Sequence, residues 1–249
     1  MSDEAWLKLR DADLKAALLD ASALETITHD QDQMAWIGKS EKQRGIDRER
    51  GYRSFIYWLA NHARTIDNHR PIHPVRRVPL REKPYLVDLA LLLLHEPLNL
   101  WEKSRQVFGT WMACMWDVWD TQRGMGKLTM IQSKKEEDSD AIVRRCLVVW
   151  DLQPAWVKEK AVYTRCHLKF PEIMGEIWGV PQGGNQMRQH TASGIHSDEM
   201  AIQEEAEDAF VAAKPTIEGG GWYLGISTPS PGFFERLVHD EIDSSRDAA

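Results

Sequence analysis

The chain has 249 residues, 43% hydrophobic and 28% charged, which is the composition of an ordinary globular protein. This length allows one α/β domain with an appendage, or two small domains. The formal net charge of −7 argues against a dedicated, uniformly basic nucleic-acid-binding domain, although it permits a local basic groove. The longest apolar run, Leu89–Leu94, is far too short to span a bilayer, and the N-terminus lacks the pattern of a signal peptide. We therefore expect a soluble protein.

The cysteines and histidines give no sign of a zinc site. The three cysteines are far apart in the sequence and form no C-x-x-C pair: Cys114, Cys146 and Cys166. This usage suits a reducing cytoplasm. His62, His69 and His73 fit no standard zinc spacing either, and we expect them to be solvated residues of a connector.

The first part of the chain is predicted to be helical and polar. Residues 1–65 carry apolar residues at helical spacing, and the strongly charged segment Lys39–Gly51 is either an exposed helix or a linker. His69–Pro84 contains four prolines and is predicted to be an extended connector. We therefore divide the chain into an N-terminal helical region with its connector, residues 1–75, and a main domain, residues 76–249.

Strands and helices alternate in the main domain. The predicted helices cover Tyr85–Leu94, Thr110–Asp120, Glu136–Arg145 and 202–213, and the predicted strands cover Leu98–Trp101, Lys127–Gln132, 191–197 and Gly221–Ser227. Residues 146–190 have a less regular pattern. This alternation predicts an α/β fold with a mostly parallel sheet covered by helices on both faces. Such sheets bind ligands at the carboxyl ends of their strands.

Two adjacent carboxylates, Asp198 and Glu199, follow one of these predicted strands. An Asp near Mg²⁺ beside a Glu that orients the attacking water is the arrangement that nucleoside-triphosphate hydrolysis requires. The alternative interpretation is a solvated helix start, where adjacent acids are common. His196 and Ser197 are unusual in a strand that precedes such acids. Either this strand lies at the margin of the core, or these polar groups find partners.

A deviant phosphate-loop pattern lies upstream, between a predicted strand and a predicted helix. Gly109 occupies the position where the standard G-x-x-x-x-G-K-[ST] loop has its lysine. Thr110 could still place a hydroxyl on Mg²⁺, and the amides at the helix start could bind phosphate. The alternative is a basic surface turn.

The loop resembles that of the ATPase domain of large terminase subunits, the DNA-packaging motors of tailed phages. In that family the lysine often moves to the front of the loop, as in K-[SA]-R-Q-x-G-x-[ST]. The resemblance assigns ATP binding to Lys103, Ser104, Arg105, Gln106, Val107, Phe108, Gly109 and Thr110. Phe108 stands where the family usually has glycine, and Gly109 is expected to restore the flexibility of the backbone.

The same resemblance extends over residues 80–235 and implies three further roles. Tyr85 would contact adenine, although Leu86 replaces the expected glutamine, and Tyr85 could equally pack within its helix. Ser227 and Thr228 resemble the coupling motif that senses the γ-phosphate, with a turn that ends a strand as the alternative. Arg188 is the candidate for an arginine finger supplied in trans. Its rivals are Arg144 and Arg145.

The resemblance implies an Mg²⁺-dependent ATPase in which Thr110 and Asp198 hold the metal and Glu199 aligns the water. It further implies translocation of double-stranded DNA into a procapsid in the host cytoplasm, with portal protein and small terminase subunit as partners. The chain would act as a homo-oligomeric ring, be a monomer in isolation, and lack nuclease activity. The alternatives are another helicase-like DNA-dependent ATPase, or a non-hydrolysing, P-loop-derived assembly protein.

Overall fold

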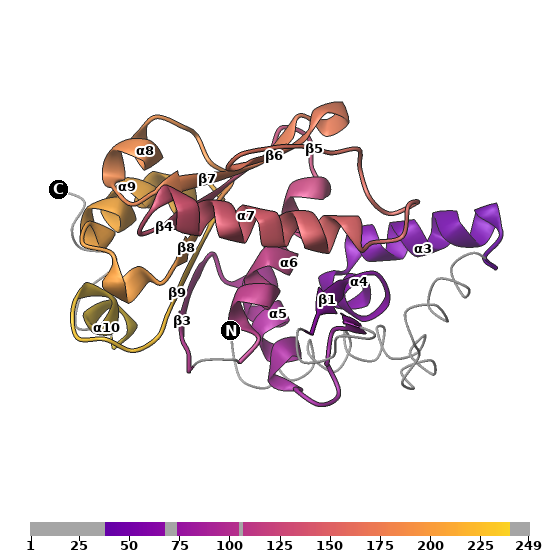
Figure 1. Ribbon diagram of the computed structural model, residues 1–249, viewed down its shortest axis with the longest axis horizontal. Helices are drawn as coiled ribbons and strands as arrows, with labels where there is room; N and C mark the ends of the chain where they lie inside the picture. The colour runs from indigo at the N-terminus through magenta and orange to yellow at the C-terminus, as the bar shows by residue number, and fades with distance from the viewer. Residues whose placement is uncertain (1–37, 68–73, 105–106, 240–249) are drawn as a thin grey trace. The chain divides into compact units, whose positions relative to one another are not determined.

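The computed structural model describes residues 38–67, 74–104 and 107–239 (Figure 1). These residues fall into two compact units. The first comprises the described residues up to His95 together with Val148–Glu159, and the second comprises Glu96–Leu147 together with the described residues from Lys160 onward. The predicted division into residues 1–75 and 76–249 is a different kind of boundary, because it marks where an ATPase domain would begin. That assignment stays a prediction.

The first unit is built mainly from helices. It contains α3 (Glu41–Arg53), α4 (Phe55–Asn61), α5 (Tyr85–His95) and the antiparallel strands β1 (Arg64–Ile66) and β2 (Val75–Arg77). Helix α3 begins with a capping box, in which the Ser40 hydroxyl accepts from the Gln43 amide and the Gln43 side chain accepts from the Ser40 amide. Most of α3 is exposed. The segment Lys39–Gly51 is thus mostly an exposed helix and not a linker, whereas α4 is buried from Phe55 to Ala60.

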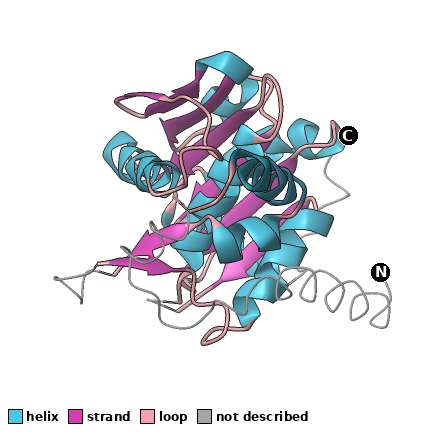
Figure 2. Cartoon of the chain, turned by 90° about the vertical axis from the view of Figure 1, so that its right-hand side faces the viewer, coloured by secondary structure: helices cyan, strands magenta, loops and turns pink. Residues whose placement is uncertain are grey.

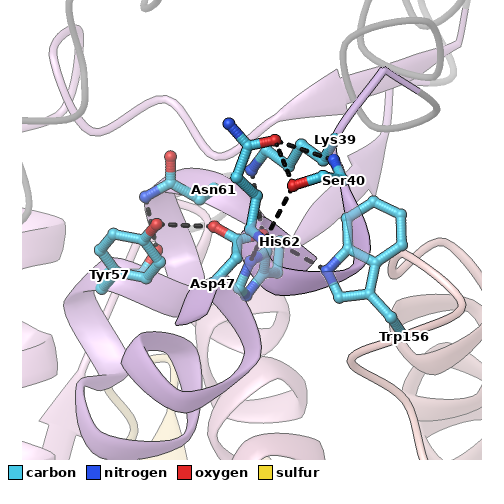
Figure 3. A network of polar contacts seen from close by, with 8 residues as sticks. Lys39, Ser40, Asp47, Tyr57, Asn61, His62 and Trp156 are labelled. Carbon is cyan, nitrogen blue, oxygen red and sulfur yellow. Dashed lines mark hydrogen bonds and ion pairs between the residues drawn. The ribbon is translucent and has the colours of Figure 1, made fainter. Parts of the chain in front are cut away.

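A buried carboxylate, that of Asp47 on α3, is the centre of a polar network in this unit (Figure 3). It accepts hydrogen bonds from the Tyr57 hydroxyl at 2.7 Å and from His62 Nε2 at 2.9 Å. The Trp156 indole donates from 3.4 Å, and the Lys39 ammonium lies at 3.0 Å. The network joins α3, α4 and the segment around Trp156, because the carboxylate satisfies donors from all three.

The prediction that His62 is solvated is wrong, because its side chain has no exposed surface. The ring packs against α3 at Gly51, where an added Cβ would lie 2.5 Å from His62 Nδ1. Glycine at this position therefore allows the histidine to pack directly against the helix. His69 and His73 lie outside the described residues.

A seven-stranded sheet forms the core of the second unit. Its order is β3-β9-β8-β4-β7-β6-β5. The strands are β3 (Leu98–Glu102), β4 (Leu128–Ser133), β5 (Val162–Thr164), β6 (His167–Phe170), β7 (Gly175–Pro181), β8 (Gly194–Asp198) and β9 (Trp222–Ser227). The first five in the order are parallel, and β6 and β5 add antiparallel to one edge. The predicted α/β class with a mostly parallel sheet is confirmed.

Helices cover both faces of this sheet (Figure 2). One face carries α6 (Gly109–Gln122) and α7 (Glu136–Asp151), and the other carries α8 (Gly184–Arg188), α9 (Ala206–Glu218) and α10 (Phe233–Val238). The alternation along β8 assigns the faces: His196 points to α6, where it meets Asp117, whereas Ile195 joins the apolar cluster of Phe210 and Phe234. Among the described residues, every helix is too short or too polar to cross a membrane.

The structure corrects the irregular interpretation of residues 146–190. Helix α7 continues to Asp151, and β5, β6, β7 and α8 follow it. Strand β5 has three residues and β6 has four, so neither presents a long alternating pattern. Strand β7 contains Gly179, a residue type that makes a strand harder to predict from sequence. The glycine allows α7 to pack closely on β7, because an added Cβ would lie 3.2 Å from the Ser139 carbonyl.

Helix α9 also differs from its predicted bounds. Residues Met200–Ile202 form a 3-10 turn, and α9 starts at Ala206 instead of at residue 202. The helix then runs past Pro215 to Glu218. Pro215 lacks a backbone N–H donor, but its carbonyl still accepts from the Gly219 amide at 2.9 Å. The helix therefore continues for three residues past the proline before it ends.

Candidate active site

The predicted loop, the two acids and the predicted coupling motif meet at one edge of the sheet. Strands β3, β9 and β8 are parallel neighbours, so their carboxyl ends lie side by side. The Lys103 amide donates to the Ser227 carbonyl at 2.9 Å. The Lys103 ammonium lies 3.5 Å from Glu199 Oε1, although the two residues are 96 positions apart. The fold thus brings a cation and a carboxylate from two separate predicted motifs to one place.

Phe108 adopts the backbone conformation that its position in the loop requires. It is the N-cap of α6 and has φ 66° and ψ 4°, in the left-handed region that glycine occupies without strain. The expectation that Gly109 restores this flexibility is wrong, because Gly109 has no positive φ. Gly109 instead makes room: an added Cβ would lie 2.9 Å from Lys103 Cδ. The lysine side chain therefore lies against the first turn of α6.

The start of α6 offers backbone donors to an anion. Phe108 is the N-cap residue, and its side chain has no acceptor that could cap the first backbone amides of the helix. Thr110 lies in the first turn and is half-buried, as is Val107, whereas Ser104 is exposed. Arg105 and Gln106, which the resemblance places in the loop, lie outside the described residues.

Asp198 ends β8 inside the protein. Its side chain is 8% exposed, and its Oδ1 atom has no hydrogen-bond partner among the described residues. Burial raises the pKa of this carboxyl, and the nearby His196 opposes the shift. A buried carboxylate oxygen without a partner is the kind of hard ligand that Mg²⁺ prefers. The surroundings of Asp198 therefore suit the predicted metal ligand.

Glu199 turns away from the strand direction and toward the loop. Its φ of 51° and ψ of 42° place it in the left-handed region, which is uncommon for a residue with a side chain. The side chain is 36% exposed, and its ion-pair partner Lys103 is 13% exposed. The turn thus separates the two acids: Asp198 stays in the core, and Glu199 reaches the solvent-accessible edge.

His196 has a hydrogen-bond partner in the core. Of the two explanations for a polar residue in this strand, a partner or a place at the margin of the core, the first therefore holds. Its Nδ1 lies 2.8 Å from Asp117 Oδ2 on α6, and both side chains are fully buried. Burial by itself lowers the pKa of His196, but the charge and hydrogen bond of Asp117 raise it to about 9. Strand β8 lies between β4 and β9, so it is not at the margin of the sheet.

Two further side chains hold the turn that carries the acids. The Ser227 hydroxyl accepts from the Ala201 amide at 3.1 Å, so Ser227 bonds both to this turn and to the loop. Gln203 Nε2 donates to the Asp198 carbonyl at 2.8 Å and to the Ser197 hydroxyl at 3.1 Å. Sequence reasoning missed Gln203, because no motif or spacing marks it. Thr228 follows the end of β9 and is half-buried.

Tyr85 belongs to the first compact unit. It begins α5, is 38% exposed, and its ring centroid lies 6.0 Å from the Lys83 ammonium. The site described above lies wholly in the second unit. A contact of Tyr85 with adenine therefore stays a prediction.

The three candidate arginines have different surroundings. Arg188 ends α8, where it is exposed and donates to Asn185 Oδ1 at 3.4 Å. Arg144 is held by Asp140, with Nε 2.8 Å from Oδ2. The Arg145 guanidinium lies 5.5 Å from the centroid of a tryptophan ring on α6. Of the three, Arg145 is the one whose charge acts on Asp198, where it opposes the rise in the pKa of that carboxyl.

No protein-family profile matches the chain, and no curated protein matches its sequence. Eight chains of known structure match the fold. One is the large terminase ATPase domain of Thermus phage P74-26, with a TM-score of 0.46 and 18% identity over 55% of this chain and 62% of that one. A variant of that domain with an arginine replaced by alanine gives 0.45 and 16% over 60% and 67%. The chain thus spans less than two thirds of the first structure, and the similarity concerns the fold.

Proposed function

We propose that the chain is an ATP-hydrolysing motor domain of the large-terminase type, which drives double-stranded DNA into a viral procapsid. The observation that carries this proposal is the approach of Lys103 to Glu199 at the carboxyl edge of the sheet, 3.5 Å apart, beside the buried Asp198. A phosphate-binding cation, a metal ligand and a water-aligning carboxylate are the groups that phosphoryl transfer to water requires. The motif resemblance supplies the packaging role.

Each group has a distinct task in this proposal. Lys103 and the first amides of α6 bind the β- and γ-phosphates, where fixed positive charge stabilises the transition state. Asp198 and Thr110 would hold Mg²⁺, which neutralises phosphate charge when it is bound. Glu199 accepts a hydrogen bond from the attacking water and orients it. Before nucleotide binds, Lys103 holds Glu199 in an ion pair. The phosphates compete for that lysine and so release the carboxylate to the water.

Ser227 is the coupling residue in this proposal. Its carbonyl bonds to the loop through the Lys103 amide, and its hydroxyl bonds to the turn after Glu199 through the Ala201 amide. A displacement of the loop when the γ-phosphate leaves therefore reaches β9 and the turn together. Thr228, the next residue, begins the segment that would carry this movement onward.

Steady-state ATP turnover with Mg²⁺ tests the proposal. We expect Glu199→Gln to lower kcat by about 10²-fold or more while nucleotide still binds. We expect Lys103→Ala to lower both nucleotide affinity and kcat, by about 10²-fold in kcat. The exposed pair Lys134–Glu204, 3.7 Å apart, provides matched controls, and Lys134→Ala and Glu204→Gln should leave turnover unchanged. Equal losses in the control variants would contradict the assignment.

The partner decides between the packaging motor and its alternatives. Addition of double-stranded DNA and procapsids with portal and small terminase subunit should stimulate turnover and protect the DNA from nuclease. Strand separation without packaging would favour a helicase-like ATPase. No turnover and no nucleotide binding under any of these conditions would favour a non-hydrolysing assembly protein.

A further inference from the structure

Two cysteines that are distant in the sequence meet in the core of the second unit. Cys114 lies on α6 and Cys146 on α7, and both are fully buried. Asp117, one helical turn after Cys114, is buried with them. A sulfur from each cysteine and a carboxylate oxygen of Asp117 all lie within 4.8 Å of one another. Helix packing therefore creates a ligand set that the spacing of the cysteines does not reveal.

The polar atoms of this cluster are incompletely satisfied. Asp117 Oδ2 accepts from His196 at 2.8 Å and lies 3.8 Å from Cys146 Sγ, whereas Asp117 Oδ1 has no hydrogen-bond partner among the described residues. Cys114 Sγ lies 3.9 Å from the Ile142 carbonyl oxygen, a long contact for a weak donor. A fully buried carboxylate oxygen without a partner is costly in an apolar core. A bound cation would remove that cost.

We propose that Cys114, Asp117 and Cys146 bind a zinc ion that joins α6 to α7 beneath the candidate active site. Two thiolates and a carboxylate suit zinc among the common divalent cations, because sulfur ligands select against Mg²⁺ and Ca²⁺. This inference does not depend on the proposed ATPase function, because the proposed zinc ligands are other residues than those of the loop and the two acids.

Geometry and charge are both compatible with this site. With Zn–S near 2.3 Å and Zn–O near 2.0 Å, the ligand atoms of a tetrahedral site lie about 3.3–3.8 Å apart. The ligand atoms lie within 4.8 Å of one another, so the pairs need to approach by at most about 1.0–1.5 Å, which side-chain rotations supply. On binding, each thiol gives its proton to water, so one dication replaces two protons. The exchange therefore leaves the net charge of the cluster unchanged.

His196 would orient the carboxylate ligand. Hydrogen bonds from histidine to a metal-bound carboxylate fix the ligand and tune its basicity. Asp117 Oδ2, which lies 3.8 Å from Cys146 Sγ, is the oxygen that His196 holds, and Oδ1 has no partner among the described residues. The histidine in this strand would thus serve the metal cluster in addition to filling the core.

The test measures metal in the full chain, purified under reducing conditions from zinc-supplemented medium. We expect about one zinc per chain by mass spectrometry, retained after dialysis, and at least roughly tenfold less in Cys114→Ser and in Cys146→Ser. Cys166→Ser is the matched control, because Cys166 is also a buried thiol but lies outside the cluster. It should retain the metal fully. Equal zinc in all three variants would overturn the proposal.

A second measurement does not depend on the folding of the variants. The wild-type chain is refolded from denaturant with Co²⁺ in place of zinc, under a reductant. A thiolate-to-cobalt charge-transfer band and tetrahedral d–d bands are expected, since two sulfurs bind the ion. Refolded wild type that lacks these bands and contains no zinc above the level of the buffer would also overturn the proposal.

Discussion

Two residues with left-handed backbone flank the candidate active site. Phe108 opens α6 at φ 66°, and Glu199 ends the acid-bearing strand at φ 51°. Such conformations cost about 1–3 kcal/mol in residues other than glycine, and they persist where surrounding structure enforces them. In each case the turn aims a functional group: the amides of α6 toward the loop, and the Glu199 carboxylate toward Lys103. The backbone strain at Phe108 and Glu199 therefore accompanies the orientation of these two groups in the candidate active site.

Substitution of Phe108 tests the role of its backbone conformation. Phe108→Asn and Phe108→Val both remove the ring, but asparagine tolerates the left-handed region and a β-branched residue does not. We expect the valine variant to have a free energy of unfolding about 1 kcal/mol or more below that of the asparagine variant. Urea unfolding of the two variants measures this difference. Equal stabilities would mean that the loop can adopt another conformation without cost.

At the scale of elements, close contact between β8 and β9 depends on a glycine. A Cβ added to Gly194 would lie 2.1 Å from Trp222 Cε2. The indole thus lies directly over the start of β8, where it also donates to the buried Asp120 at 3.0 Å. This contact orders the end of the sheet opposite the candidate active site.

Gly194→Ala should therefore destabilise the second unit. We expect a loss of about 1–3 kcal/mol in the free energy of unfolding, because the added methyl group forces the indole or the strand to move. Gly45→Ala is the contrasting variant, since Gly45 lies within α3 with no atom in the path of an added Cβ. It should gain about 0.5–1 kcal/mol. Chemical denaturation measures both, and a neutral Gly194→Ala would contradict the packing described.

The Asp47 network makes the stability of α3 and α4 depend on pH. Burial lowers the pKa of His62 below its ordinary value, and the charges of Lys39 and Arg64 act in the same direction against the pull of Asp47. In the unfolded chain His62 titrates near pH 6.5, at about its ordinary pKa. Protons therefore bind the unfolded state preferentially below that pH. The stabilisation is complete above about pH 6.5 and is lost as the pH falls below it.

Hydrogen exchange of the α3 and α4 amides between pH 7.5 and 5.5 would check this dependence, after correction for the intrinsic exchange rate. We expect protection to fall by up to about 1.4 kcal/mol per pH unit once the pH is below about 6.5. The variant His62→Gln keeps an amide donor for Asp47 but does not titrate, so its protection should be flatter over the same range. Identical slopes in the two proteins would assign the effect to other groups.

At the scale of the whole molecule, the proposed motor requires neighbouring subunits. Arg188 is exposed at the end of α8 and bonds only weakly to Asn185, so it is available to a second copy of the chain. A trans arginine contributes about 10³–10⁵-fold in phosphate-loop enzymes that use one. Arg144, which is committed to Asp140, is a weaker candidate for this role.

Mixing two inactive variants tests whether Arg188 acts in trans. Arg188→Ala keeps Glu199, and Glu199→Gln keeps Arg188, so a mixed ring contains interfaces with both groups intact. We expect each variant alone to be inactive and the mixture, under conditions of assembly, to recover a measurable part of the wild-type turnover. Failure of the mixture to recover, or normal turnover by Arg188→Ala alone, would remove Arg188 from the site.

Much of the fold followed from local patterns. The helices over α5 and α6 and the strands β3, β4, β8 and β9 lie within a few residues of their predicted positions, because each has a clear periodicity or apolar run. The strands of segment 146–190 do not follow from local patterns, because β5 and β6 are only three and four residues long and β7 contains glycine and ends in proline. There, pairing with neighbouring strands stabilises an extended backbone that the local sequence does not mark.

The amino-acid sequence specifies which groups are available and their order along the chain: a basic loop before a helix, two acids at the end of one strand, and a Ser-Thr pair at the end of the last. Which of these groups meet depends on the tertiary fold. The order β3-β9-β8 sets Lys103 beside Glu199, and the packing of α6 on β8 and α7 joins His196, Asp117 and two cysteines. Local periodicity specifies which face of an element is buried, but not which neighbour covers it, so these pairings depend on long-range packing.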